Sequence, residues 1–324
     1  MSLYARLAPR GPDGFGYSST ADEVTAGLSL APRRILITGC NSGLGLETLR
    51  VLALRGAHVI GAARTLERAR AACAAAGGHT SAVACELTDP ASVSACVATV
   101  RAGGALDALI CNAGIMAPQK LQQAYGYELQ FFANHIGHFM LVTGLMDALS
   151  PQGRIVMLSS RAHHRAPPGG IQFDNLSGEH GYRPFTAYGQ SKMANLLFAK
   201  ELARRLGTGG RSAIAVHPGV IATPLGRHLS GVTVSLVYAV GSLLFFKSIP
   251  QGAATQCFAA VHPRAATLSG AYLADCQVAQ PRADAEDAAL ARRLWEVSEQ
   301  IVDDLRQGRQ QSPTAASWEA SKKP

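Results

Sequence analysis

A glycine-rich turn between an apolar segment and a helical segment constrains the fold of this chain more than any other feature. Gly39, Gly43 and Gly45 lie between the apolar run Arg34–Thr38 and a helical pattern over Gly43–Leu54. Glycines permit a tight turn and let the backbone approach a diphosphate closely, while the amino end of the helix faces the negative charge. The arrangement predicts the first half of a βαβ unit and a dinucleotide site.

The rest of the chain continues this alternation of strands and helices. Helical patterns, the first over Leu66–Ala76, separate further apolar runs, which we predict to be strands at residues 57–63, 81–85, 106–111, 153–158, 212–216 and 270–274. Such alternation is typical of parallel strands joined by crossover helices. We therefore predict the α/β class, with a single doubly wound parallel sheet (Rossmann fold) that has helices on both faces. Ligands of such sheets bind at the carboxyl ends of the strands.

Composition narrows the classes of protein and partner. Apolar residues make up 48% and charged residues 16% of the 324 residues, which indicates a folded globular protein and not a disordered chain. The net charge of +8 indicates a basic surface, or a site for phosphates or an anionic membrane surface. No basic run with interleaved aromatic residues is present, so we predict no nucleic-acid partner.

The cysteines and the apolar segments bear on location. The seven cysteines include no Cys-x-x-Cys pair and are odd in number, which favours a reducing compartment. The first ten residues contain no apolar core long enough for a signal peptide. The longest apolar stretch, residues 232–246, is shorter than the roughly 20 residues that span a bilayer. We expect a cytoplasmic protein without a transmembrane segment, whose apolar stretch could contact a membrane surface.

A tyrosine and a lysine four residues apart, Tyr188 and Lys192, are the candidate chemical centre. Positions i and i+4 share one face of a helix, so the phenol and the ammonium can point the same way. A nearby positive charge is expected to lower the pKa of Tyr188 from its usual value of about 10 and to ease proton exchange with a substrate oxygen. With Ser160 upstream, this chemistry suits the interconversion of ketones and alcohols.

The residue after the second predicted strand bears on the choice of dinucleotide. An acidic residue at that place would hold the ribose hydroxyls of NAD, but this chain has Arg64. Arginine can instead pair with the 2′-phosphate of NADP, and Arg68 or Arg33 could assist. We therefore favour NADP(H) over NAD(H). The alternative is that Arg64 is only a solvated residue at the start of a helix.

Six motifs in the same order resemble the short-chain dehydrogenase/reductase family, in its retinol-dehydrogenase-like and WW-domain-oxidoreductase-like branch. The resemblance covers about residues 33–305. The motifs are Thr38-Gly-x-x-x-Gly-x-Gly45, Asn112-Ala-Gly114, Asn134-His-Ile-Gly-His-Phe139, Arg154-Ile-Val-Met-Leu-Ser-Ser160, Tyr188-x-x-x-Lys192 and His217-Pro-Gly-Val220 with Thr223.

The resemblance implies a role for each member of a catalytic tetrad. Tyr188 would be the acid/base, and Lys192 would hold the nicotinamide ribose and tune Tyr188. Ser160 would orient the substrate oxygen, with Ser159 as the alternate, and Asn134 would anchor a proton-relay water.

The cofactor-binding set combines the residues of the glycine turn with those that the resemblance implies. Glu86 stands where the family often has an aspartate beside the adenine. The set is Gly39, Asn41, Ser42, Gly43, Leu44, Gly45, Arg64, Glu86, Leu87, Asn112, Ala113, Gly114, Tyr188, Lys192, Pro218, Gly219, Val220 and Thr223.

Metal binding is not expected. His135, His138, His163 and His164 lie in segments that the family uses structurally, and no carboxylate or cysteine completes a ligand set.

Taken together, the residues and the resemblance predict an NADP(H)-dependent oxidoreductase acting on a small hydrophobic ketone, aldehyde or alcohol. Its NAD(P)-binding Rossmann catalytic domain would span residues 31–308, with a substrate lid at about 224–250, an N-terminal extension at 1–30 and a flexible tail at 309–324. Within the extension, Thr20-Ala-Asp-Glu23 predicts a capping box and a short helix. The apolar lid favours a hydrophobic substrate. The same apolar stripe could instead be packed core or an oligomer face, and a buried helix is the commoner explanation in a chain of this size.

Three questions stay open at this point. A non-catalytic NADP-binding regulatory or interaction protein could share the fold, and a sugar-nucleotide epimerase or dehydratase could share the Tyr/Lys pair. The family analogy leaves a homodimer or a homotetramer as candidate assemblies.

Overall fold

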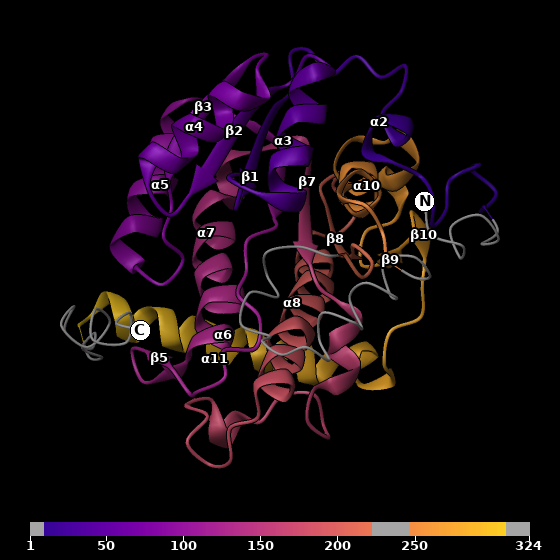
Figure 1. Ribbon diagram of the computed structural model, residues 1–324. Coiled ribbons are helices and arrows are strands. Elements are labelled where there is room, and N and C mark those ends of the chain that lie inside the picture. Colours follow the sequence, from indigo (N-terminus) through magenta and orange to yellow (C-terminus); the bar gives the residue numbers. More distant parts are fainter. Residues whose placement is uncertain (1–9, 222–245, 309–324) are drawn as a thin grey trace, which may run out of the picture.

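An eight-stranded sheet forms the centre of the molecule (Figure 1), in the strand order β10-β9-β8-β7-β4-β1-β2-β3. The computed structural model describes residues 10–221 and 246–308. Neighbouring strands pair in parallel, except that β10 runs antiparallel to β9. The strands are β1 (Arg34–Thr38), β2 (His58–Ala63), β3 (Thr80–Ala84), β4 (Leu106–Cys111), β7 (Leu149–Leu158), β8 (Ser212–His217), β9 (Tyr272–Ala274) and β10 (Gln277–Val278).

Helices cover both faces of this sheet, and a small hairpin of β5 (Gln123–Ala124) and β6 (Tyr127–Glu128) lies apart from it. The α-helices are α2 (Ala21–Val24), α3 (Gly43–Leu54), α4 (Leu66–Ala76), α5 (Pro90–Ala102), α6 (Leu129–Phe131), α7 (Gly137–Leu145), α8 (Pro184–Leu206), α10 (Ile249–Val261) and α11 (Ala288–Arg306). Short 3₁₀ turns span Met146–Ala148, Arg161–Arg165, Phe173–Asn175, Pro263–Thr267 and Ala283–Glu286, and a π-helix spans Phe132–Ile136.

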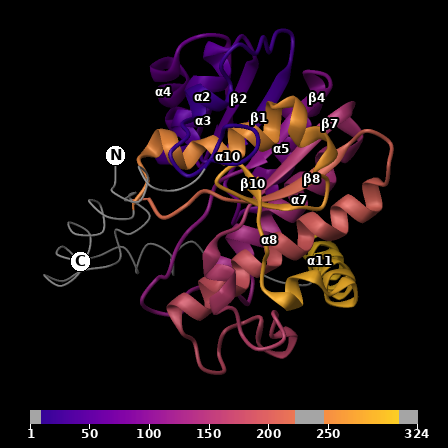
Figure 2. The same cartoon turned by 90° about the vertical axis from the view of Figure 1, so that its right-hand side faces the viewer.

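Alternation along the strands divides the core into two layers. Ile35 and Ile37 of β1 point into a layer shared with α2, α3, α4 and α10, whereas Leu36 points into the layer shared with α5, α7, α8 and α11. Successive side chains of a strand face opposite sides, so the buried apolar run of β1 serves both layers. Figure 2 shows α10 on one side of the sheet, with α8 and α11 on the other.

Side-chain caps fix where several helices begin. The Thr65 hydroxyl accepts from the backbone N–H of Arg68 at the start of α4, and Asp89 caps α5 with Pro90 as its first residue. Ser248 and Gln251 form a capping box at the start of α10. Each cap satisfies an N–H group that has no partner inside its helix.

The predicted fold class is confirmed. Four elements, β1, α3, α4 and β4, have the predicted bounds, while other strands differ at their ends. The largest difference is in β7, which begins at Leu149 instead of residue 153, because a register shift against β4 lets its first residue pair with Leu106. The strand β10 and the β5–β6 hairpin were not predicted, since runs of two residues carry no periodic signal.

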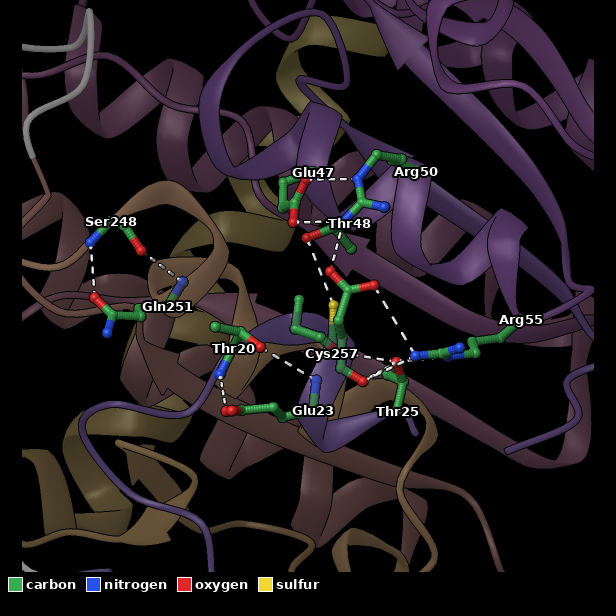
Figure 3. A network of polar contacts seen from close by, with 12 residues as sticks. Thr20, Glu23, Thr25, Glu47, Thr48, Arg50, Arg55, Ser248, Gln251 and Cys257 are labelled. Carbon is green, nitrogen blue, oxygen red and sulfur yellow. Dashed lines mark hydrogen bonds and ion pairs between the residues drawn. The ribbon is translucent and has the colours of Figure 1, made fainter. Parts of the chain in front are cut away.

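The predicted capping box at Thr20 is confirmed. Its hydroxyl accepts from the Glu23 N–H while the Glu23 carboxylate accepts from the Thr20 N–H, and the short helix α2 follows (Figure 3). The Arg50 guanidinium of α3 donates to the carboxylate of Asp22, 2.6 Å away, and Arg55 donates to Thr25. These bonds hold α2 and the residue after it against α3.

Candidate active site

The glycine turn after β1 has the backbone that a diphosphate site requires. Gly39 and Gly43 have φ values of 69° and 53°, which glycine adopts at little cost. A Cβ at Gly45 would overlap the carbonyl oxygen of Gly39, so the first turn of α3 can pack against the turn only because Gly45 lacks a side chain. The exposed residues Asn41 and Ser42 lie between these glycines.

The amino end of α3 differs from those of α4, α5 and α10 in its cap. The side chain of its N-cap residue, Ser42, makes no capping hydrogen bond, so the first N–H groups of α3 are not satisfied by that residue. Such groups, with the positive end of the helix dipole, bind phosphate. The turn therefore fits the diphosphate of a dinucleotide, with Leu44 half-buried behind it.

Hydrogen bonds join the residues that follow β4 to Thr38, the last residue of β1. The Thr38 hydroxyl accepts from the N–H groups of Asn112 and Ala113, both at 3.0 Å, and the Asn112 amide donates to the Thr38 carbonyl at 2.8 Å. The motif Asn112-Ala113-Gly114 thus forms a wall beside the glycine turn. The Gln256 side chain of α10 also contacts Asn112, with Nε2 3.4 Å from its Oδ1.

The adenine end of the predicted site lies at the ends of β2 and β3. Arg64 is exposed directly after β2, and Glu86 follows β3, which pairs in register with β2. The Glu86 carboxylate accepts from both the N–H and the hydroxyl of Thr88. Leu87 is buried.

The suggestion that Arg33 assists at the adenine end is wrong. Arg33 precedes the first residue of β1, and its guanidinium donates to the Val261 carbonyl at the end of α10. It therefore lies at the amino ends of the strands, on the opposite edge of the sheet from the glycine turn.

Tyr188 and Ser160 meet because α8 packs very closely on the turn after β7. A Cβ on Gly189 would lie 2.7 Å from the Ala162 carbonyl oxygen and from the Ala166 nitrogen. This close approach brings Tyr188, only 8% exposed, near the Ser160 hydroxyl. The neighbouring Ser159 instead donates its hydroxyl to the Lys192 carbonyl at 2.8 Å, inside the protein.

Lys192 is buried beside Tyr188, but it does not have the expected effect on the phenol. Its Nζ lies 5.7 Å from the centroid of the Tyr188 ring and donates to the Leu158 carbonyl at 3.1 Å. Burial raises the pKa of Tyr188 to about 12, although the nearby Ser160 hydroxyl opposes this rise. Burial lowers the pKa of Lys192 to about 8. The expected lowering of the Tyr188 pKa is therefore wrong for this structure, because desolvation of the phenolate outweighs the other influences.

Asn134 lies in the π-helix that precedes α7, where the Gly137 N–H donates to the Phe132 carbonyl five residues back. Its side-chain oxygen accepts from the Ile115 N–H at 2.8 Å, and its amide nitrogen donates to the Ile115 carbonyl and to the Ser191 hydroxyl. Widened helical turns of this kind are frequent at functional sites. Asn134 thus joins the wall after β4 to the helix that carries Tyr188.

Gly114 is where the cofactor wall and the tetrad come together. A Cβ placed on it would lie 3.1 Å from Asn134 Oδ1 and 3.5 Å from Lys192 Nζ. The structure thus brings Asn134, Ser160, Tyr188 and Lys192 together beside the predicted cofactor residues at the ends of β1 and β4.

The motif after β8 lies along the same edge of the sheet. Gly219 has a φ of 96°, and the exposed Val220 accepts through its carbonyl from the Lys247 N–H at 2.9 Å. Pro218 lies between the end of β8 and this turn. Thr223 and most of the predicted lid, residues 224–245, lie outside the described residues.

The buried histidines of this region make hydrogen bonds inside the protein. His135 pairs with Ser298 and His138 with Thr38, both at 2.9 Å, and His163 donates to the Ser160 carbonyl while accepting from the Arg282 N–H. Over residues 10–221 and 246–308, no three His, Cys, Asp or Glu side chains gather as a metal site would require. Within the same ranges, no helix has the length and apolar character needed to span a bilayer.

Several residues that shape the site were missed by the sequence analysis. Ser191 holds Asn134 against α8, Asn195 donates to the same Leu158 carbonyl as Lys192, and His138 joins Thr38 to the π-helix. The spacing of Asn134 and His138, four residues apart on a helix, could have pointed to the contact between these two residues, but no signal pointed to the contact with Thr38.

Comparison with known proteins matches this arrangement to one family. The model of the short chain dehydrogenase family matches residues 33–231. Short-chain dehydrogenase TIC 32 B, chloroplastic, from Brassica napus is 39% identical over 94% of this chain and 100% of its own length. Human retinol dehydrogenase 14 is 36% identical over 83% of this chain and 86% of its own length. The solved structure of a short chain dehydrogenase from Burkholderia cenocepacia in complex with NADP is 25% identical, with a TM-score of 0.60 over 76% of this chain and 96% of the other.

The match spans the glycine turn, the wall after β4 and the helix with Tyr188 and Lys192, and a nicotinamide dinucleotide is the cofactor of that family. The chain is an oxidoreductase of alcohols and carbonyl compounds and belongs to the short-chain dehydrogenase family.

Proposed function

We propose that this chain transfers hydride between NADP(H) and a hydrophobic ketone, aldehyde or alcohol, with Tyr188 as the acid/base. The observation that carries the proposal is the placement of the Tyr188 phenol near the Ser160 hydroxyl and beside the Lys192 ammonium. This group lies next to a glycine turn whose backbone fits a diphosphate.

The nicotinamide, when bound, supplies or accepts the hydride. Hydride transfer to a carbonyl builds negative charge on its oxygen, which the Ser160 hydroxyl stabilises while Tyr188 donates its proton. With a pKa of about 12, Tyr188 holds that proton at neutral pH and is ready to act as an acid.

The proposed preference for NADPH rests on Arg64. Its exposed guanidinium follows β2, where an acidic side chain would repel a 2′-phosphate and bind free ribose hydroxyls. The solved relative in complex with NADP supports the same choice. For the remaining cofactor-binding and catalytic residues, we propose the sets that were predicted from the sequence. Ser160 is preferred to Ser159 as the catalytic serine.

An apolar substrate is supported by side chains near the proposed nicotinamide end. Phe185, three residues before Tyr188 on α8, is exposed, and so are Val220 after β8 and Ile249 at the start of α10. Binding sites for small molecules are lined mostly by apolar side chains with few polar anchors. The name of the human relative, retinol dehydrogenase 14, fits an apolar alcohol as the substrate class.

We also propose that the chain is divided into an extension at residues 1–30, a catalytic domain at residues 31–308 and a tail at residues 309–324. A homodimer or homotetramer is proposed by family analogy. A cytoplasmic location is proposed because all seven cysteines are free and buried.

The test is NADPH oxidation by the purified protein across aliphatic, aromatic, steroid and retinoid carbonyls. Tyr188→Phe should lower turnover about 10²- to 10⁴-fold while the Kd for NADPH stays unchanged, because only the acid/base is lost. Tyr125→Phe, which keeps a ring stacked on Phe132, is the matched control. Wild-type turnover in Tyr188→Phe would refute the proposal.

A further inference from the structure

A buried imidazole connects the cofactor side of the site to the catalytic side. His138 Nε2 lies 2.9 Å from the Thr38 hydroxyl at the end of β1, and His138 Nδ1 lies 2.9 Å from the main-chain carbonyl oxygen of Asn134. Thr38 is also the residue that holds Asn112 and Ala113, and Asn134 is the residue that holds Ile115 and Ser191. One side chain thus contacts both groups of residues.

The available donors and acceptors decide where each proton lies in the series of hydrogen bonds from Thr38 through His138 to Asn134. The two lone pairs of the Thr38 oxygen accept from the N–H groups of Asn112 and Ala113, so its own proton must go to His138 Nε2. Nε2 is then an acceptor, and the single proton of a neutral imidazole lies on Nδ1. That proton is donated to the Asn134 carbonyl.

The surroundings of His138 favour this neutral form. The side chain is fully buried, and burial, with the nearby charge of Lys192, lowers its pKa to about 4. A proton on Nε2 would also face an oxygen whose lone pairs are both used. The imidazole is therefore a fixed connector with one donor and one acceptor.

We propose that His138 is a positioning residue that couples the cofactor wall to the catalytic π-helix by holding Thr38 with one ring nitrogen and the carbonyl of Asn134 with the other. This inference rests on the proposed function. Thr38 orients the wall Asn112–Gly114, so the Nε2 contact controls cofactor affinity. Asn134 is held against Ser191, which donates to the Tyr188 carbonyl at 2.8 Å, so the Nδ1 contact controls turnover.

Two substitutions separate the two contacts. The side-chain nitrogen of asparagine is as many bonds from Cβ as His138 Nδ1, so His138→Asn can still donate to the Asn134 carbonyl. The side-chain oxygen of glutamine is as many bonds from Cβ as Nε2, so His138→Gln can still accept from Thr38. Each variant keeps one contact and loses the other.

The expected result is a split between the two kinetic properties. His138→Asn should weaken NADPH binding roughly ten- to a hundredfold and leave kcat within about twofold, whereas His138→Gln should do the reverse. Changes of equal size in Kd and kcat in both variants would show that the ring only fills space, and would overturn the proposal. So would an unchanged Kd and kcat in both variants.

A readout without turnover keeps this test separate from that of the proposed function. In ¹⁵N NMR spectra of the wild-type protein, His138 should carry its proton on Nδ1, and a proton on Nε2 would overturn the proposal. If the wild type reduces no carbonyl tested, the proposed function fails, but the tautomer and the NADPH affinities still decide the role of His138. Thermal unfolding of each variant shows whether it folds.

The matched control is Ser298→Ala. It removes one buried hydrogen bond from His135, on the same π-helix, and should lower Tm without changing Kd or kcat.

Discussion

The proposed catalytic end and the proposed adenine end of this site are built in opposite ways. At the catalytic end, Tyr188, Lys192 and Asn134 are 8%, 4% and 0% exposed, and the side chains of Lys192 and Asn134 are hydrogen-bonded to residues of other elements. At the adenine end, Arg64 is exposed after β2, and the Glu86 carboxylate is bonded only two residues away, to Thr88.

The difference follows from the cost of burying polar groups. A buried hydroxyl, amide or ammonium without a partner is costly, so the catalytic end must be satisfied by the protein itself and is ordered before any ligand arrives. An exposed guanidinium has water as its partner, so its role depends on what binds. The catalytic end should therefore affect stability and turnover, and the adenine end should affect only the choice of cofactor.

The largest expected effect is acid unfolding caused by histidines near the catalytic end. Burial lowers the pKa of His135 and His217 to about 3 and of His138 and His163 to about 4. Below pH 6.5 the unfolded chain binds protons that the folded protein does not, so stability falls as the pH falls. Each histidine should cost about 2 kcal/mol at pH 5, and four together approach the whole stability of a typical domain.

Urea unfolding between pH 7 and pH 5 measures this loss. His163→Gln should make the dependence of unfolding free energy on pH shallower by about one proton. His180→Gln replaces an exposed imidazole, at a residue that is hydrogen-bonded to Asn175 through its backbone, and is the control, with no change expected. Equal slopes in the wild type and His163→Gln would contradict the account of the catalytic end.

The fold was predictable because the central strands are unbroken apolar runs with glycine or helical patterns between them. β1 and β4 had the predicted bounds for that reason, since both are buried on two faces. The edge strand β10 and the first residue of β7 were not predictable. β10 has two residues, and the start of β7 depends on a register shift against β4, which sequence periodicity does not encode.

The members of the site were predictable, but their environments were not. The motifs placed Tyr188, Lys192, Ser160 and Asn134 in one region because parallel strands end on the same edge. The pKa of Tyr188 depends on burial, which follows from packing between α8 and the turn after β7. The contact of His138 with Thr38 joins residues 100 positions apart, and no local pattern indicates it. The error over Arg33 was avoidable, because a residue before a strand lies at its amino end.

At the adenine end, Arg64→Asp should change cofactor choice and nothing else. Losing a charge-assisted bond to the 2′-phosphate and gaining a like charge should lower the preference for NADPH over NADH about ten- to a hundredfold. The measurement is kcat/KM for both cofactors with one carbonyl substrate, together with the urea midpoint, which should not move. Arg70→Asp, an exposed arginine on α4, controls for net charge. An unchanged preference in Arg64→Asp would remove Arg64 from the cofactor site.

The smallest expected effect comes from Glu86→Gln. Glutamine keeps an oxygen that can accept from Thr88, so the turn after β3 should be retained, and only the negative charge is lost. Because Glu86 and Arg64 follow paired strands, that charge opposes the binding of a 2′-phosphate across a solvent-exposed region. NADPH should therefore bind up to about fivefold more tightly, with a smaller change for NADH, as expected for an exposed charge interaction. Titration of both cofactors by protein fluorescence measures this. Weaker binding of both cofactors would instead mean that Glu86 accepts a hydrogen bond from the adenine and does not act on the 2′-phosphate.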